Sequence, residues 1–225
     1  MNSLNYEGDN SNMVVRNKLV MRELASNLIA YLKKHYTYYW LSQITGLSPS
    51  VLNRYAKRVV VPNYERSIEL YNKLKPIIAK HIRQIIDKDD WSILYSPTTL
   101  DVLSTVITFK MAGQRVTKIL AFEEMSPLAI STAIKIGAPF VIITQTRNLC
   151  YSSWLSIDYR IGGIWLSYFI PRDSLRKNDS ILYIDTIMTP IKDDVLTKLE
   201  QLMDITIEHK LILKNLMDEL RTEST

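Results

Sequence analysis

The first part of the chain carries apolar residues at helical spacing. Val20, Leu24 and Leu28 recur every four residues, which places them on one face of an amphipathic helix. A second apolar stripe over residues 70–86 predicts another helix. Pro76 should kink or restart that helix, because proline lacks the N–H that a helix interior uses. The pattern predicts an all-α region at the front of the chain.

Between the two stripes, residues 38–58 combine two short helical segments with a turn. Gly46 lies where the chain must reverse, and glycine accepts a positive φ there. Ser48 and Pro49 form a helix start, with a hydroxyl N-cap followed by proline at the first helical position. The spacing predicts a helix–turn–helix whose second helix enters the major groove of DNA. The alternative is an ordinary pair of packed helices with no role in DNA binding.

The polar side chains of this second helix are of the kinds that DNA contacts require. Short polar groups near the helix N-terminus suit base edges, and long cations farther along suit phosphates. Gln43, near the end of the preceding helix, could also contact the DNA backbone. The predicted DNA-binding residues are Gln43, Ser48, Ser50, Asn53, Arg54, Lys57 and Arg58.

The rear part of the chain alternates helix and strand. Helical stripes begin at the Ser-Pro pairs of positions 96 and 126 and end at Gly113 and Gly137, and a further helix is predicted over residues 193–203. Short strands separated by helices indicate a parallel α/β sheet. The predicted strands are the apolar runs 118–122, 140–144 and 180–184.

Residues 145–172 break this alternation. They hold six aromatic residues, with Gly162 and Gly163 near the middle of the segment. A Gly-Gly pair between two strand-like runs predicts a β-hairpin. Three roles stay open for it: covering a ligand site at the strand ends, forming a dimer surface, or capping the core.

Two segments of the rear part resemble type I phosphoribosyltransferases. Residues 118–144, KILAFEEMSPLAISTAIKIGAPFVIIT, resemble the family's strand, diphosphate-binding turn, helix and following strand. Residues 176–193, RKNDSILYIDTIMTPIKD, resemble its phosphoribosyl-pyrophosphate signature. Residues 145–172 fall where the family places a flexible hood. The resemblance covers about residues 90–205 and implies a parallel-sheet domain with a β-hairpin hood.

The signature segment departs from the family's pattern. Asp185 aligns with the first of its two paired acids, but Thr186 replaces the second. Thr189 aligns with the first threonine, and Pro190 and Ile191 follow where the family uses glycine and hydroxyls around a phosphate. Proline removes an N–H donor, and a β-branched side chain prevents the close approach that glycine allows. These changes predict a homologue without catalytic activity.

Acidic side chains also stand where the resemblance places the diphosphate. Glu123 and Glu124 would oppose an anion at that turn. The resemblance implies a nucleotide or a phosphorylated metabolite as a possible effector. The alternative is a pocket that has lost its ligand, in a domain that serves as a dimer scaffold. The candidate ligand-binding residues are Glu124, Ser126, Tyr159, Asp185, Thr186, Thr189 and Lys192.

Charge is divided unevenly along the chain, whose net charge is +5. Residues 1–88 hold 14 Lys and Arg against 6 Asp and Glu, whereas residues 89–225 hold 14 against 17. A basic front part suggests a polyanion as its partner. The alternative is a solvated helical surface that happens to be rich in lysine.

Composition excludes several classes of protein. The 225 residues include only 6 glycines, none in a GxGxxG or GxxxxGK[ST] spacing, which argues against Rossmann and P-loop nucleotide sites. Cys150 is the single cysteine, so a disulfide scaffold is excluded, and no metal site or cofactor is expected. The apolar runs are too short for a membrane span, and the polar start does not resemble a signal peptide. We therefore expect a cytoplasmic protein without a membrane partner.

These observations combine into one hypothesis. A helix–turn–helix joined to a phosphoribosyltransferase-like domain is similar to haloarchaeal sugar-catabolism regulators and, in logic, to bacterial purine repressors. The resemblance implies an archaeal-type transcriptional regulator that binds double-stranded DNA as a homodimer, without catalysis. The alternative is an active phosphoribosyltransferase with a non-standard phosphate loop. The predicted parts are a flexible tail (1–12), a helix–turn–helix domain (13–75), a linker helix (76–88) and a phosphoribosyltransferase-like domain (89–225).

Overall fold

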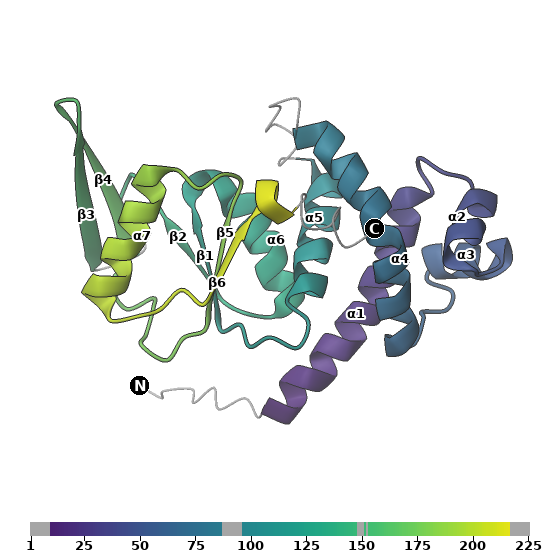
Figure 1. The fold of residues 1–225 in the computed structure, drawn as a ribbon. Coiled ribbons are helices and arrows are strands. Elements are labelled where there is room, and N and C mark those ends of the chain that lie inside the picture. Colours follow the sequence, from purple (N-terminus) through teal and green to yellow (C-terminus); the bar gives the residue numbers. More distant parts are fainter. Residues whose placement is uncertain (1–9, 87–95, 148–150, 152, 217–225) are drawn as a thin grey trace. The chain divides into compact units, whose positions relative to one another are not determined.

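The computed structural model of the chain describes residues 10–86, 96–147, 151 and 153–216 (Figure 1). Most of the predicted tail, and Cys150, lie outside the described residues. The elements in chain order are α1 (Asn10–Leu32), α2 (Tyr38–Thr45), α3 (Pro49–Ala56), α4 (Tyr64–Ile86), α5 (Pro97–Lys110), β1 (Lys118–Phe122), the 3₁₀ helix η2 (Glu123–Met125), α6 (Ser126–Ile136), β2 (Phe140–Ile143), β3 (Trp154–Ile161), β4 (Ile164–Pro171), β5 (Ile181–Asp185), α7 (Pro190–Met203) and β6 (His209–Ile212).

The chain divides into two compact units. One comprises residues up to Ile78 together with Thr105–Gly113, and the other comprises Ala79–Ser104 together with Gln114–Thr225. The first unit is helical, and the second contains all the described strands. The mixed α/β class expected from the sequence is therefore confirmed. Within the described residues, no helix has both the length and the apolar character that crossing a membrane requires.

Helices α2 and α3 begin where the sequence predicts, but α3 ends at Ala56, before Lys57 and Arg58, which were expected on it. The Thr37 hydroxyl oxygen accepts from the Trp40 backbone N–H at 3.2 Å at the start of α2. Gly46 ends that helix with φ +73°, in the left-handed region that favours glycine. The Ser48 hydroxyl oxygen accepts from the Val51 N–H at 3.4 Å at the start of α3. Two short helices thus follow one another with a three-residue connection.

Helix α4 continues through Pro76 without a break. The predicted restart is therefore wrong. Proline removes the N–H that would bond to the carbonyl of Asn72, but Asn72 is exposed, so water can take that place. The buried positions Leu70, Leu74 and Ile78 keep one apolar stripe across the proline. The predicted boundary between residues 75 and 76 lies inside this single helix.

The second unit is built on a four-stranded parallel sheet of order β2-β1-β5-β6. The chain moves from β1 outward to β2 on one side, and from β5 outward to β6 on the other. Because crossovers between parallel strands are right-handed, connections in opposite directions place their helices on opposite faces. Figure 1 shows α6 and α7 on opposite sides of the strands accordingly. The predicted parallel sheet is confirmed.

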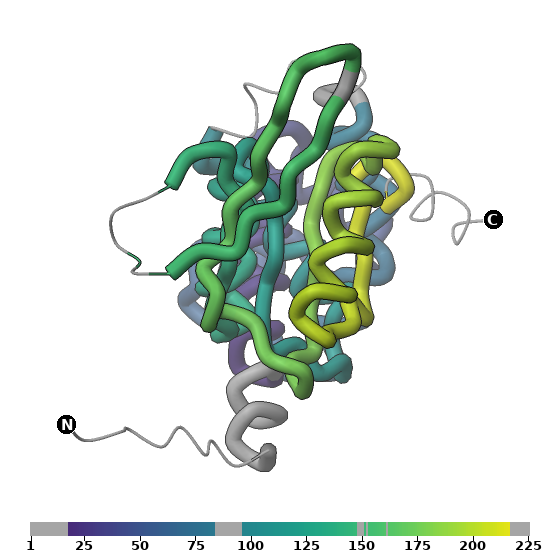
Figure 2. The backbone as a smooth tube through the Cα atoms, turned by 90° about the vertical axis from the view of Figure 1, so that its left-hand side faces the viewer, coloured from purple at the N-terminus to yellow at the C-terminus, as the bar shows by residue number. Residues whose placement is uncertain are grey.

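The hairpin predicted at the Gly-Gly pair is also confirmed. Strands β3 and β4 are antiparallel, and Gly162 and Gly163 form the turn with φ +53° and +91° at the end of a long ribbon (Figure 2). Toward its base, Ile157 and Ile170 are buried in the same core as β1, β5 and α7. At its tip, Trp165 is exposed. The base of the hairpin therefore caps the core, which was one of its three predicted roles.

Two features near the end of the described chain were not predicted: the start of α7 and the strand β6. Helix α7 begins at Pro190 instead of residue 193, because the Thr189 hydroxyl oxygen accepts from the Lys192 N–H at 3.3 Å and caps the helix. After α7, residues His209–Ile212 pair with β5 as strand β6. The sequence of residues 204–225 fits either a strand followed by a helix or a helix throughout, and the structure shows a strand followed by a helical turn from residue 213.

Candidate functional site

The strand order creates a crevice between the carboxyl ends of β1 and β5. These neighbouring strands continue into connections that run to opposite faces of the sheet. Open α/β sheets bind ligands at such switch points, where the loops diverge and leave space. The residues that follow β1 are Glu123 and Glu124, and those that follow β5 begin at Thr186. The candidate site therefore lies between these two turns.

Asp185 closes strand β5 and is fully buried. Its carboxylate accepts hydrogen bonds from the Tyr183 hydroxyl, from the Thr186 backbone N–H at 2.6 Å and from the Thr186 hydroxyl at 3.3 Å. Burial, followed by the adjacent Asp185 charge, raises the pKa of Tyr183 far above its usual range. A buried carboxylate requires such partners, because an unpaired charge is costly in a low dielectric.

Lys192 supplies the positive charge for this buried acid. It belongs to the first turn of α7, and its ammonium lies 2.9 Å and 2.8 Å from the two Asp185 carboxylate oxygens. The same nitrogen lies 2.6 Å from Glu124 Oε1 and 5.3 Å from the centre of the Phe122 ring. Burial acts to lower the pKa of Lys192, but its bonds to Asp185 and Glu124 outweigh burial and raise that pKa. Lys192 is thus a charged internal partner of both acids.

The turn before α7 has few groups left for a phosphate. The Lys192 N–H is taken by the Thr189 side chain, and Pro190 has no N–H. Asp193 adds a negative charge in the same helical turn and pairs with Lys210 at 3.6 Å. A helix N-terminus binds anions through its free N–H groups and its dipole. Here fewer N–H groups are free, and the Asp193 carboxylate opposes the positive end of the dipole.

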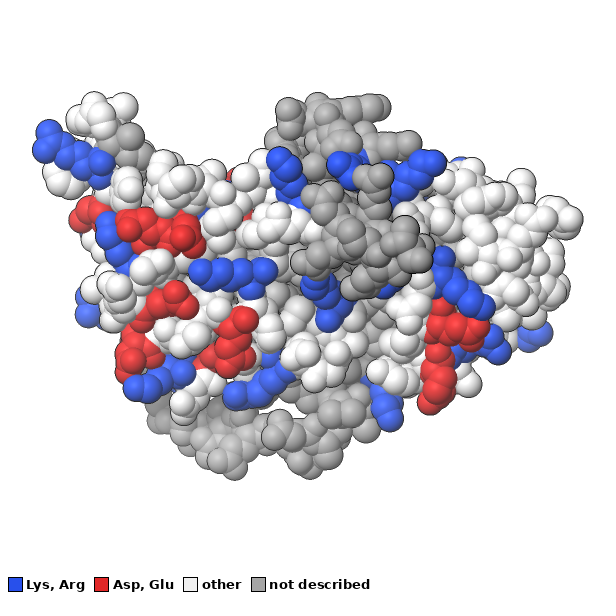
Figure 3. All heavy atoms as spheres, viewed as in Figure 1, with Lys and Arg blue, Asp and Glu red and all other residues white. Residues whose placement is uncertain are grey.

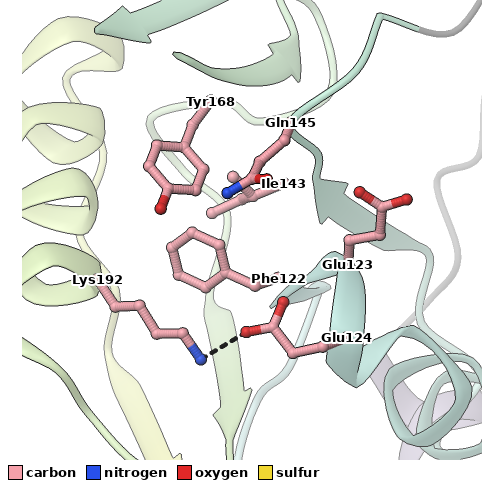
Figure 4. A pocket seen from close by; sticks show the side chains of 7 residues that line it. All are labelled: Phe122, Glu123, Glu124, Ile143, Gln145, Tyr168 and Lys192. Carbon is pink, nitrogen blue, oxygen red and sulfur yellow. Dashed lines mark ion pairs between the residues drawn. The ribbon is translucent and has the colours of Figure 1, made fainter. Parts of the chain in front are cut away.

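A pocket of about 340 Å³ opens beside this network (Figure 4). The Phe122 ring lies at its centre in the view, with the Tyr168 phenol and the Gln145 amide on one side and the Lys192–Glu124 pair on the other. Glu123 stands apart from that pair. The lining residues are Phe122, Glu123, Glu124, Ile143, Gln145, Tyr168 and Lys192.

Four of the predicted ligand-binding residues come together here: Glu124, Asp185, Thr186 and Lys192 are linked by the contacts above. Of these four, Glu124 and Lys192 line the pocket, and the other three predicted residues lie outside both the pocket wall and this network. Thr189 caps α7, Ser126 begins α6, and the ring of Tyr159 lies under Lys198 at 4.8 Å. Their role in ligand binding remains a prediction.

Sequence reasoning did not place Phe122, Ile143, Gln145 and Tyr168 in the site. Phe122 and Ile143 end strands β1 and β2, and Gln145 follows shortly after β2. The rule that ligands bind at the carboxyl ends of strands could have found these three. Tyr168 lies in the interior of β4 and had no such signal.

The contacts around Asp185 and the two glutamates bear on phosphoribosyl pyrophosphate, the ligand that the family resemblance implies. Its ribose hydroxyls would need Asp185, whose oxygens are occupied by Tyr183, Thr186 and Lys192. Its phosphates would meet the carboxylates of Glu123 and Glu124. Within the part of the chain that the structure describes, no group of three His, Cys, Asp or Glu side chains could hold a metal ion.

The predicted DNA-binding residues lie on and around α3 in the first unit. The helix buries Leu52 and contacts α1 and α2. Asn53 is half-buried, and the other six predicted residues are exposed. The exposed set is Gln43, Ser48, Ser50, Arg54, Lys57 and Arg58.

The three cations of this surface differ in their partners. The Arg58 guanidinium donates to Asn27 Oδ1 at 2.5 Å, and Arg58 adopts φ +55°, so it is held back against α1. Arg54 and Lys57 have no ion pair with any residue that the structure describes. Two cations are therefore available to an external anion, and a third is already hydrogen-bonded.

Charges near α7 are arranged differently. Figure 3 shows acidic side chains gathered over α7 and interleaved with Lys and Arg. Asp194 pairs with Lys198 at 2.8 Å, and Asp204 pairs with Lys177 at 2.5 Å. Exposed pairs of this kind contribute little to stability, but they leave little net charge for a partner.

No protein-family model matches the chain, and no curated protein matches it. Solved structures similar to it include adenine phosphoribosyltransferases. The protein from Thermoanaerobacter pseudethanolicus is 15% identical over 52% of this chain and 69% of its own, with a TM-score of 0.45. The protein from Rhodothermus marinus is 19% identical over 53% and 69%, with a TM-score of 0.45.

The Saccharomyces cerevisiae protein, in complex with an imino-altritol bisphosphate and adenine, is 14% identical over 59% of this chain and 77% of its own, with a TM-score of 0.44. These neighbours cover about half of the chain.

Proposed function

We propose that the protein is a DNA-binding transcriptional regulator whose first unit binds the operator through α3. The observation that carries the proposal is the outer surface of α3. It offers short polar side chains at the helix start, Ser48 and Ser50, and then two cations near the helix end, Arg54 and Lys57, that pair with no acid among the described residues. Short polar groups suit base edges and long cations suit phosphates. The excess of Lys and Arg in residues 1–88 supports the same proposal.

In this proposal two copies of the protein form a homodimer through their second units. The second unit also binds a small molecule but catalyses no reaction. Operators of dimeric regulators repeat with the protein's two-fold symmetry. The saturated Asp185 and the acidic pocket support the absence of phosphoribosyl transfer. Sedimentation of the full chain tests the dimer, and a binding footprint with two half-sites would support it.

The test of DNA binding is a mobility-shift assay of the full chain against genomic fragments at several salt concentrations. We expect sequence-preferring binding, and we expect Arg54→Ala with Lys57→Ala to lower the salt slope by about 1 for each phosphate that the variant no longer neutralises. The matched control is Arg176→Ala with Lys177→Ala, which removes the same charge from exposed positions of the second unit. The proposal fails if no fragment is preferred, or if the two double variants behave alike.

The enzyme alternative has its own measurement. An active phosphoribosyltransferase would release pyrophosphate when mixed with phosphoribosyl pyrophosphate and a purine or pyrimidine base. We expect no release, because Lys192 occupies the acid that the ribose would need. Release that is lost in Asp185→Asn would establish the enzyme and overturn the non-catalytic part of the proposal.

A further inference from the structure

The charge of the switch-point pocket has the wrong sign for the phosphorylated effector that the family resemblance implies. Two carboxylates, those of Glu124 and Asp185, hold the ammonium of Lys192, and a third, that of Glu123, lines the pocket apart from them. The ammonium lies within 3 Å of both Glu124 and Asp185, so its charge is used within the protein. The pocket therefore keeps a net negative charge.

The acids of the pocket are not equally occupied. Asp185 is fully buried and saturated by its neighbours. Glu124 shares Lys192 and keeps a side chain that is 55% exposed. Glu123 is exposed, and its carboxylate has no ion pair or hydrogen bond with any residue in the described ranges. One free carboxylate and one half-used carboxylate thus line the pocket.

The remaining walls are apolar and aromatic. The Phe122 ring packs edge-on against Tyr168, with ring centres 5.5 Å apart, and Ile143 lies beside them. The Gln145 amide points toward these rings in Figure 4. An aromatic wall next to carboxylates is the arrangement that receives organic cations, because ring faces attract positive charge and carboxylates accept N–H bonds.

We propose that this pocket binds a small organic cation, an amine or amidine attached to a flat or apolar body. The charged N–H groups would donate to Glu123 and Glu124, and the body would lie against Phe122 and Tyr168. The Gln145 side chain can accept or donate at the open side. A volume of about 340 Å³ is near the lower end of the range for ligand pockets, which suits a compact molecule.

An inorganic divalent ion suits the pocket less well than an organic cation. Calcium requires six to eight oxygen ligands, and magnesium requires near-ideal octahedral geometry. Here the third carboxylate is held by Lys192, and the aromatic walls supply no ligand. The proposal does not depend on DNA binding, since it concerns the pocket of the second unit alone.

The test is calorimetric titration of the full chain, without DNA and at low ionic strength, with benzamidine and with benzamide. The two probes share one shape and differ in charge. We expect benzamidine to bind at least about tenfold more tightly, because only its amidinium can form charge-assisted bonds with the carboxylates. Inorganic pyrophosphate and adenosine monophosphate serve as anionic probes and should not bind.

The variants Glu123→Gln and Asp173→Asn assign the effect to the pocket. Each removes one exposed acid, but Asp173 lies outside the pocket. Glu123→Gln should weaken benzamidine binding about fivefold or more without lowering the melting temperature, and Asp173→Asn should leave it unchanged. No benzamidine binding, equal affinity for benzamide, preferred binding of pyrophosphate, or equal behaviour of the two variants would each overturn the proposal.

Discussion

The two units of the protein differ in how they surround their cations. In the second unit Lys192 is paired with acids, and in the first unit no acid of the described chain pairs with Arg54 or Lys57. Lys192 lies between two carboxylates and is only 17% exposed. Arg54 and Lys57 stand exposed near the end of α3 with no acid from the described residues paired to them. The first is an interior counter-ion, and the other two face solvent.

The difference shows how a cation can be assigned to folding or to binding. A charge that is buried and paired holds the protein together, and its removal leaves the partner acid unpaired. A charge that is exposed and unpaired costs the fold little to lose, so its substitution can test for an external partner without unfolding the protein. Lys192 is therefore an interior counter-ion that also lines the pocket, and its contact with a ligand stays a prediction.

The largest expected effect is that of Lys192→Met. The substitution leaves Asp185 buried without its cation, and we expect the free energy of unfolding to fall by about 3–5 kcal/mol. Denaturant unfolding of the full chain measures this fall. Adding Asp185→Asn should recover much of the loss, because the second change removes the unpaired charge.

The control for this comparison is Lys198→Met, whose exposed pair with Asp194 should contribute less than about 1 kcal/mol. If the two lysine substitutions had equal effects, or if Lys192→Met cost less than about 1 kcal/mol, Lys192 would not be the interior counter-ion described above.

The stabilisation that the charge of Lys192 provides should also appear in the pH dependence of the free energy of unfolding. The pKa of Lys192 is higher in the folded protein than in the unfolded chain. Its stabilisation is therefore complete below the unfolded value of about 10.4 and is lost as pH rises through the folded value. Unfolding measured from neutral to alkaline pH should show wild type losing stability more steeply than Lys192→Met above about pH 10. Parallel curves would contradict this. Other titrating groups, such as the tyrosines, are common to both proteins and cancel in the difference.

The smallest expected effects are those of the two helix caps, one in each region. Ser48 caps α3 and Thr189 caps α7, each before a proline. Ser48→Ala and Thr189→Ala should each lower the free energy of unfolding by about 1 kcal/mol. Ser50→Ala is the control, since Ser50 is exposed and caps no helix. A loss at Thr189 several times that at Ser48 would show that this cap also positions Lys192, and equal losses would show that it acts on the helix alone.

Much of the architecture could be predicted from local pattern. The apolar runs at β1, β2 and β5 and the Gly-Gly hairpin were all found, because short buried strands are bounded by clear turn residues. The start of α7 was missed since Thr189 was interpreted as a phosphate ligand and not as a helix cap. Strand β6 could not be predicted, because HKLI is a short apolar run whose conformation depends on its pairing with β5.

The site was less predictable, since it depends on which strands are neighbours. Glu124, Asp185 and Lys192 were named from the resemblance, but their mutual pairing appears only when β1 lies beside β5. Gln145 follows the end of β2, where the strand-end rule could have found it, whereas Tyr168 lies inside β4 and carries no such signal. Pro76 shows a related limit, because the stripe of buried residues keeps α4 continuous where local propensity favours a break.

The strand order also bears on how the protein acquires its structure during synthesis. Helices α2 and α3 form from contacts between near neighbours in the chain, which assemble quickly. The junction of β1 and β5 joins Thr117 to Ser180, which are 63 residues apart. Closing so long a loop is slow and must wait until most of the second unit has left the ribosome. The helical unit can therefore be in place while the edges of β1 are still open, and that interval is when the nascent chain most needs protection from aggregation.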